Sequence, residues 1–156
     1  MDGMKMKPFP WMCPDCRQKT VSMVRRDYSI SALHDGVVYE LTVRDADIPT
    51  CSQCGQSIII TKVSEQISDE LRRAAGILSP DEIRSRRDAL GISQTELALA
   101  LRIPDTTLAR WESGGQLQPR ALDLLLRLFL DSADVRKACD PALVTENSTP
   151  LVHATE

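Results

Sequence analysis

Two Cys-x-x-Cys motifs in the first third of the chain constrain its fold more than any other feature. They are Cys13-Pro14-Asp15-Cys16 and Cys51-Ser52-Gln53-Cys54, and 34 residues separate them. Each motif can offer two thiolates to one ion, and Zn²⁺ prefers four such soft ligands in a closed tetrahedron. A segment of about 60 residues with few aromatics buries little surface, and structural zinc can add roughly 10–16 kcal/mol of folding free energy. We therefore predict one structural Zn²⁺ bound by Cys13, Cys16, Cys51 and Cys54.

Other uses of these thiols stay open at this point: a redox dithiol, an iron site or disulfides. A redox pair is disfavoured because there are two motifs and neither lies in a βαβ pattern. Four Cys ligands also leave no open position for a catalytic water, so we predict no enzyme. His34 is expected in an exposed turn rather than at the metal, and Cys139 is expected to be a packed or bystander thiol.

Apolar and polar residues alternate on both sides of His34-Asp35-Gly36, which predicts a β-hairpin between the two motifs. The alternating positions are Tyr28, Ile30 and Ala32 before the turn and Val37, Tyr39, Leu41 and Val43 after it. The apolar run Ile58-Ile59-Ile60 predicts a third strand.

From Ser64 the apolar period changes to about 3.6 residues, which is typical of helices. Four helix starts follow: capping boxes begin at Ser79 and Ser93, Asp105 can cap a third helix, and a fourth helix begins at Pro119. The predicted divisions are a zinc-binding domain at 1–63, a connecting helix or linker at 64–78, an all-α five-helix domain at 79–139 and a disordered tail at 140–156. The predicted fold class is therefore α+β.

The net charge of −3 argues at first against a nucleic-acid partner, but it is confined to the tail. Residues 140–156 hold three acidic and no basic side chains, and the rest of the chain is neutral. Its 14 Arg outnumber its 5 Lys, and Arg is the side chain that forks onto phosphates and guanine edges. The few aromatics, 4% of the chain, disfavour single-strand binding by stacking. No apolar run reaches the ~18–20 residues of a membrane span, so we expect a cytoplasmic protein.

Two short consecutive helices, 93–101 and 105–112, have the spacing of a helix-turn-helix. The second has a small polar face formed by Thr106, Thr107 and Arg110. An Arg on that face can bind guanine O6 and N7, and a Thr methyl can pack on thymine, in a major groove that admits one helix. A plain helical bundle is the alternative.

The residues of this region closely resemble the Cro/cI-type (XRE) helix-turn-helix family over 79–131. The resemblance is carried by Leu90-Gly91-Ile92-Ser93-Gln94-Thr95-Glu96-Leu97-Ala98, Leu108-Ala109-Arg110-Trp111-Glu112-Ser113-Gly114 and Pro119. It implies DNA contacts by Gln94, Thr95, Thr106, Thr107 and Arg110. It also implies that Trp111 lies in the core and that the Glu112 carboxylate fixes neighbouring backbone. The sequence departs from the family at Arg102, where Gly is usual, and at Pro104, where Ser often caps the helix.

A two-knuckle zinc domain followed by an XRE domain is similar to the MqsA-type (YgiT-like) antitoxin family over most of residues 10–135. This resemblance implies a DNA-binding repressor of its own operon, a homodimer on a palindromic operator, and a protein toxin bound by the zinc domain. Two alternatives stay open: a stand-alone zinc-containing XRE regulator without a toxin, and an adaptor whose zinc domain docks another protein. The dimer expectation also has a basis in the residues of the fourth helix. Its predicted core stripe is Leu122, Leu125, Leu126 and Phe129, and Leu124 and Leu128 lie off that stripe.

Overall fold

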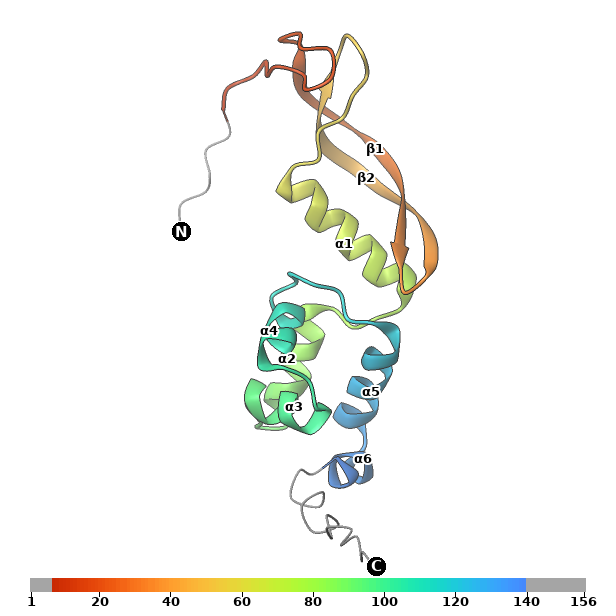
Figure 1. The fold of residues 1–156 in the computed structure, drawn as a ribbon, viewed down its shortest axis with the longest axis vertical. Helices are drawn as coiled ribbons and strands as arrows, with labels where there is room; N and C mark the ends of the chain where they lie inside the picture. Colours follow the sequence, from red (N-terminus) through yellow and green to blue (C-terminus); the bar gives the residue numbers. More distant parts are fainter. Residues whose placement is uncertain (1–6, 140–156) are drawn as a thin grey trace, which may run out of the picture. The chain divides into compact units, whose positions relative to one another are not determined.

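The computed structural model describes residues 7–139. The described residues form two compact units, which divide between Ala75 and Gly76 (Figure 1). The α+β class is confirmed, since a β-hairpin is followed by helices. The predicted disordered tail at 140–156 lies outside the described residues. No helix in the described part of the chain is long and apolar enough to cross a membrane.

The first unit is built on a long antiparallel hairpin of β1 (Val21–His34) and β2 (Val37–Cys51). Its turn residues, Asp35 and Gly36, have φ angles of 49° and 74°, as a two-residue turn with both residues left-handed requires. The predicted alternation is confirmed, but the strands extend well beyond it. The register pairs Val21 with Cys51, so the hairpin brings the two cysteine motifs to its open end.

A β-bulge in the middle of the hairpin resets the side-chain alternation. Arg26 pairs with Ala46 and Tyr28 pairs with Val43, so β2 carries one more residue than β1 in this interval. Asp45 has a φ of 49°, and its N–H donates to Asp27 Oδ1 at 3.0 Å. The extra residue lets both Val43 and Ala46 face inward and become buried, although they are three residues apart.

Helix α1 (Thr61–Ala75) packs against β2 and belongs to the first unit (Figure 1). It begins before Ser64, so the predicted connecting helix is part of the cysteine-containing unit. The predicted third strand is wrong. Ile58-Ile59-Ile60 forms no strand, and the only pairing nearby is an isolated bridge between Thr50 and Ser57. Ile58 packs against the cysteines instead, and Ile59 is exposed.

The second unit holds five helices in its described part: α2 (Pro80–Ala89), α3 (Gln94–Leu101), α4 (Asp105–Glu112), α5 (Arg120–Asp131) and α6 (Ala133–Ala138). The capping boxes are confirmed: Ser79 with Glu82 begins α2, and Ser93 with Glu96 begins α3. The helices enclose one apolar core, formed by Leu78, Ile83, Leu97, Ala98, Leu101, Leu108, Trp111, Leu126, Phe129 and Leu130.

The turn between α3 and α4 accommodates the unusual Arg102 in a left-handed conformation, with φ 55° and ψ 42°. Its N–H donates to the Leu99 carbonyl at 3.1 Å, and the next N–H, of Ile103, donates to Ala98 at 3.0 Å. This is the bonding of a Schellman motif, in which glycine is usual. Pro104 is the N-cap of α4 and makes no side-chain cap hydrogen bond. The prediction that Asp105 caps this helix is therefore wrong, because Asp105 is its first residue.

Helix α5 has a buried face and an exposed apolar face. Leu126 and Phe129 are buried as predicted, Leu122 and Leu125 are half-buried, and Leu130 is a further buried residue that the predicted stripe omitted. Leu124 and Leu128 are 58% and 46% exposed. These two leucines, one helical turn apart, are the large apolar side chains that α5 leaves to solvent.

Candidate metal centre and nucleic-acid interface

Each Cys-x-x-Cys motif is a tight turn closed by backbone hydrogen bonds. In the first, Cys13 donates to the Gln18 carbonyl at 2.8 Å and its own carbonyl accepts from Arg17 at 3.0 Å. The second repeats this pattern with Cys51 to Gln56 at 2.8 Å and Gly55 to Cys51 at 2.9 Å. Arg17 and Gly55 occupy equivalent places with φ angles of 57° and 77°. The first knuckle therefore holds an arginine in a conformation that favours glycine.

The four sulfur atoms of Cys13, Cys16, Cys51 and Cys54 form one cluster and lie within 4.8 Å of one another. The Sγ atoms of Cys13 and Cys54 are 3.6 Å apart, as are those of Cys16 and Cys51. A tetrahedron with Zn–S bonds of about 2.3 Å has S···S edges of about 3.8 Å. Four soft donors at these separations fit one Zn²⁺ ion. In residues 7–139 this is the one group of three or more potential ligands that could hold a metal.

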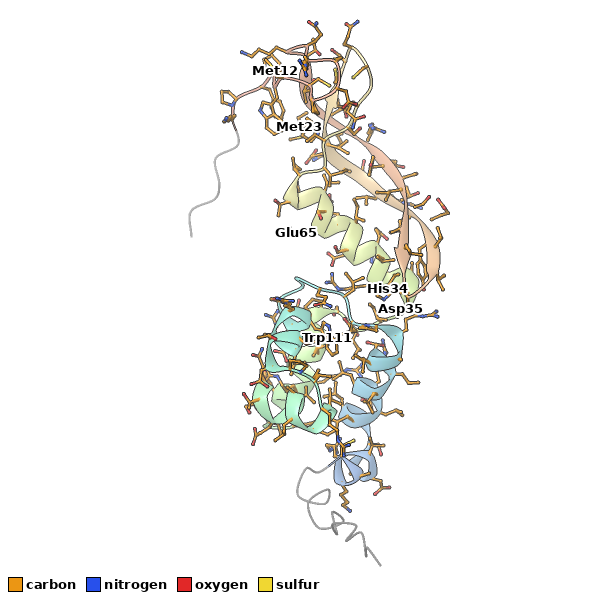
Figure 2. All side chains as sticks on the ribbon, viewed as in Figure 1. Met12, Met23, His34, Asp35, Glu65 and Trp111 are labelled. Carbon is orange, nitrogen blue, oxygen red and sulfur yellow. The ribbon has the colours of Figure 1, made fainter. Side chains whose placement is uncertain are left out.

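His34 takes no part in the cluster. It lies at the turn of the hairpin, whereas Met12, next to Cys13, lies at the opposite end (Figure 2). The side chain of His34 is only 13% exposed, so the expectation of an exposed turn residue is wrong, while its exclusion from the metal ligands agrees with the structure. Cys139 is half-buried and packs against the core of the second unit.

The local electrostatics make the thiols unequal. A hydrogen bond with the Thr20 hydroxyl, whose Oγ1 is 3.1 Å from Cys51 Sγ, lowers the pKa of Cys51 to about 6. At Cys54 a backbone N–H of Gln56 acts to lower the pKa, but burial and the neighbouring Cys13 thiol outweigh it and raise the pKa to about 12. Four thiols this close cannot all ionise without a cation, so a bound metal must displace protons and its affinity must rise with pH.

The candidate DNA-binding surface is the outer face of α4. Leu108 and Trp111 are buried in the core, and Figure 2 labels Trp111. Thr106 and Arg110, one turn apart, are exposed, and Thr107 is half-buried. Within residues 7–139 the Arg110 guanidinium has no hydrogen-bond or ion-pair partner. The predicted polar face therefore exists, and its one long cation is available to a ligand.

Glu112 is the centre of a buried polar network. It is 2% exposed, and its carboxylate accepts from Arg87 Nε at 2.7 Å and Arg87 Nη2 at 3.0 Å. Gln94 Nε2 also donates to it, at 2.7 Å. The same Arg87 donates to the Ile92 carbonyl at 2.9 Å. Glu112 thus binds side chains, and it is Arg87 that fixes the backbone, a difference from what the family resemblance implied.

This network decides what Gln94 and Arg110 can do. Arg110 does not pair with Glu112, because Arg87 and Gln94 occupy that carboxylate. Gln94 is the first residue of α3, and one of its amide hydrogens is committed to Glu112. Thr95 is exposed beside it, with its hydroxyl 3.4 Å from Asp105 Oδ2. The structure therefore joins the start of α3 to the end of α4 through one carboxylate.

Arg87 belongs to this site as the partner of Glu112, a role that the sequence alone did not predict. The signal that could have found it is its position four residues after Ile83, on the stripe of α2 that faces the core. An arginine on a buried stripe needs a buried carboxylate, and Glu112 is the buried acid in α4.

Together these features define a class: a cysteine-clustered hairpin unit that can hold a metal, joined to a helix-turn-helix unit. Residues 83–129, from α2 into α5, match the family named helix-turn-helix. These residues therefore form a helix-turn-helix, and the match supports a DNA-binding regulator of the XRE type. No curated protein matches the chain.

Proposed function

We propose that the protein is a sequence-specific DNA-binding transcriptional repressor in which α4 enters the major groove. The observation that carries this proposal is the unpartnered Arg110 on the exposed face that it shares with Thr106. Its bidentate fit to a guanine edge would supply base readout, with the threonines beside it. Nothing in this mechanism requires catalysis, and we propose no enzymatic activity.

Gln94 and Thr95 have a different proposed role. They lie in the first turn of α3, where free N–H groups and the helix dipole favour an anion. We propose that they help to seat a DNA phosphate, with Gln94 held in position by Glu112. Such a contact fixes the register of the protein on the duplex but does not choose the sequence.

Arg110→Ala tests the readout after a preferred duplex has been selected from a random library. On the selected duplex, loss of a bidentate contact should weaken binding by about 1–3 kcal/mol at one fixed salt concentration. Lys137→Ala, which removes one positive charge from α6, is the matched control and should have a small effect on selected and scrambled duplexes alike. An equal loss on both duplexes for Arg110→Ala would show that Arg110 contacts the DNA backbone. Base readout would then belong to Thr106 and Thr107. Absence of duplex binding by the wild-type chain would favour an adaptor.

We also propose a homodimer on a palindromic operator, with half-sites about one helical turn, ~34 Å, apart. The support is the exposed pair Leu124 and Leu128, since an apolar stripe on an otherwise folded helix favours a partner helix. Leu124→Glu combined with Leu128→Glu should give a monomer in sedimentation. Leu99→Glu, at a leucine of α3 that is 59% exposed, is the control. A dimer that survives the double substitution would show that the dimer interface lies elsewhere, for instance at 133–139.

Finally, we propose that the cysteine cluster binds one structural Zn²⁺ and that the unit around it holds a toxin, so that the protein is the antitoxin of a type II system that represses its own operon. The support is the order of the two units. A stand-alone regulator is the alternative. Co-expression with the product of the neighbouring gene tests this step: a neighbour that is toxic alone and forms a stable complex with this chain supports it. A neighbouring gene product that is neither toxic nor bound by this chain would favour the stand-alone regulator.

A further inference from the structure

A groove of ≈ 1060 Å³ opens in the first unit between the segment before Cys13 and the start of α1. Apolar side chains form much of its lining, among them Trp11, Met12 and Ile59. Two of them are unusually exposed for their type, Met12 at 66% and Ile59 at 42%. The groove is therefore an apolar surface that the described residues leave uncovered.

The groove is also positively charged. Three of the chain's five lysines line it, namely Lys7, Lys19 and Lys62, and no acidic residue does. Lys62 is paired with Asp47 at 3.0 Å, while Lys7 and Lys19 have no ion pair among residues 7–139. Helix α1 begins at this groove with no acidic residue in its first turn, so its dipole adds to the positive potential. An occupant must therefore combine apolar side chains with carboxylates.

Residues 140–156 of this chain have that chemistry. They contain Asp140, Glu146 and Glu156, and they lack Lys and Arg. Between the acids stand two apolar clusters, at 142–144 and 151–152. The chain's whole net charge of −3 resides in this segment, because the other residues carry equal numbers of acidic and basic groups.

We propose that the groove binds segment 140–156 of a second copy of this chain. Leu143 and Leu151 pack on the apolar lining around Trp11, and the carboxylates pair with Lys7 and Lys19. A partner that needed this surface would have to displace the segment. The proposal uses neither α4 nor the exposed face of α5, so it stands or falls independently of DNA binding and of the proposed dimer.

The test uses the zinc-loaded full-length chain labelled with ¹⁵N. Its two tryptophans give two indole N–H resonances: Trp11 reports the groove, and Trp111, 1% exposed in the other unit, is an internal control. Leu143→Asp combined with Leu151→Asp should shift the Trp11 resonance and leave that of Trp111 in place.

Lys19→Glu should also shift the Trp11 resonance, whereas Lys137→Glu, at a lysine outside the groove, should not. Lys7 is left unchanged in this test because its carbonyl accepts the Trp11 indole N–H at 2.7 Å. A synthetic peptide of residues 140–156, added to the full-length Leu143→Asp/Leu151→Asp chain, should move the Trp11 resonance back toward its wild-type position. Because the contact is partly ionic, added salt should weaken that recovery.

A Trp11 resonance that the tail substitutions leave unchanged would overturn the proposal. So would a shift that the peptide fails to reverse, since the tail would then act on the groove indirectly. The wild-type Trp11 resonance should depend on protein concentration, because the segment comes from a second copy. A Trp11 resonance that does not change with concentration would overturn the proposal.

Discussion

Replacing Arg87 by methionine should be one of the most damaging single changes in the helix-turn-helix unit. The substitution keeps the length of the side chain but removes both hydrogen bonds to Glu112 and the one to the Ile92 carbonyl. Glu112, at 2% exposure, would keep only the Gln94 amide as a partner. Breaking a buried ion pair on one side typically costs about 3–5 kcal/mol, because the remaining charge is left without compensation. We expect a loss in this range.

An exposed ion pair made by the neighbouring residue of α2 provides the matched control. Arg86 pairs with Asp131 at 3.2 Å, with side chains 37% and 64% exposed. Arg86→Met should therefore cost only about 0–1 kcal/mol. The assay is urea unfolding of the full-length chain, followed through the Trp111 indole resonance, which reports the core of this unit. The slope of free energy against urea should stay the same in both variants.

The double variant Arg87→Met with Glu112→Leu tests the physical reason for the loss. If the cost comes from a stranded buried carboxylate, removing that carboxylate should recover most of the stability. The reasoning is refuted if Arg87→Met costs no more than Arg86→Met. It is refuted equally if the double variant is less stable than Arg87→Met alone, because packing rather than charge would then dominate.

Three further outcomes follow from the structure. Arg102→Gly should raise the free energy of unfolding by about 0.5–1 kcal/mol in urea titrations. The relief of left-handed backbone strain exceeds the cost of the entropy that glycine adds to the unfolded chain. Arg102→Ala, which keeps the strain, should bring no gain. The N–H and hydroxyl of Ser93 hold the pKa of Glu96 below its usual range, so this contribution is present above about pH 4.3 and lost as the pH falls through the lowered value. Glu96→Gln should therefore flatten the acid limb of stability measured by thermal unfolding. Chelation of the metal should change the Trp11 resonance and leave that of Trp111 unchanged; loss of both signals together would show that the two units do not fold separately.

The parts of the fold that were predictable are those governed by short-range chemistry. Ser79 and Ser93 each stand three residues before a glutamate, and both capping boxes form. The Asp35-Gly36 pair fixes a two-residue turn, and the alternation around it fixes which side chains face inward. The cysteine cluster follows, because spacing within each motif and the hairpin between them determine the meeting of the four sulfurs.

The features that the sequence did not predict depend on contacts between distant residues, or on backbone conformations for which the sequence carries no characteristic residue. The bulge uses Asp45 in a left-handed conformation, without the glycine that would have signalled it. The apolar run at 58–60 resembles a strand, yet no third strand pairs with the hairpin there, and Ile58 packs on the cysteines instead. The partner of Glu112 lies 25 residues away in sequence, so local patterns could show that Arg87 faces the core but not which carboxylate it meets.

Because Val21 pairs with Cys51, a metal bound by the four cysteines would also cross-link the two strands at the open end of the hairpin. A metal that joins Cys16 to Cys51 closes a loop of about 36 residues in the unfolded chain, and the loss of entropy on such closure amounts to roughly 4 kcal/mol. The hairpin is then held at both ends, by the turn at Asp35-Gly36 and by the ion at the other end. Without the ion its strands would separate from the cysteine end first, so amide hydrogens near Val21 would exchange with solvent earlier than those near His34.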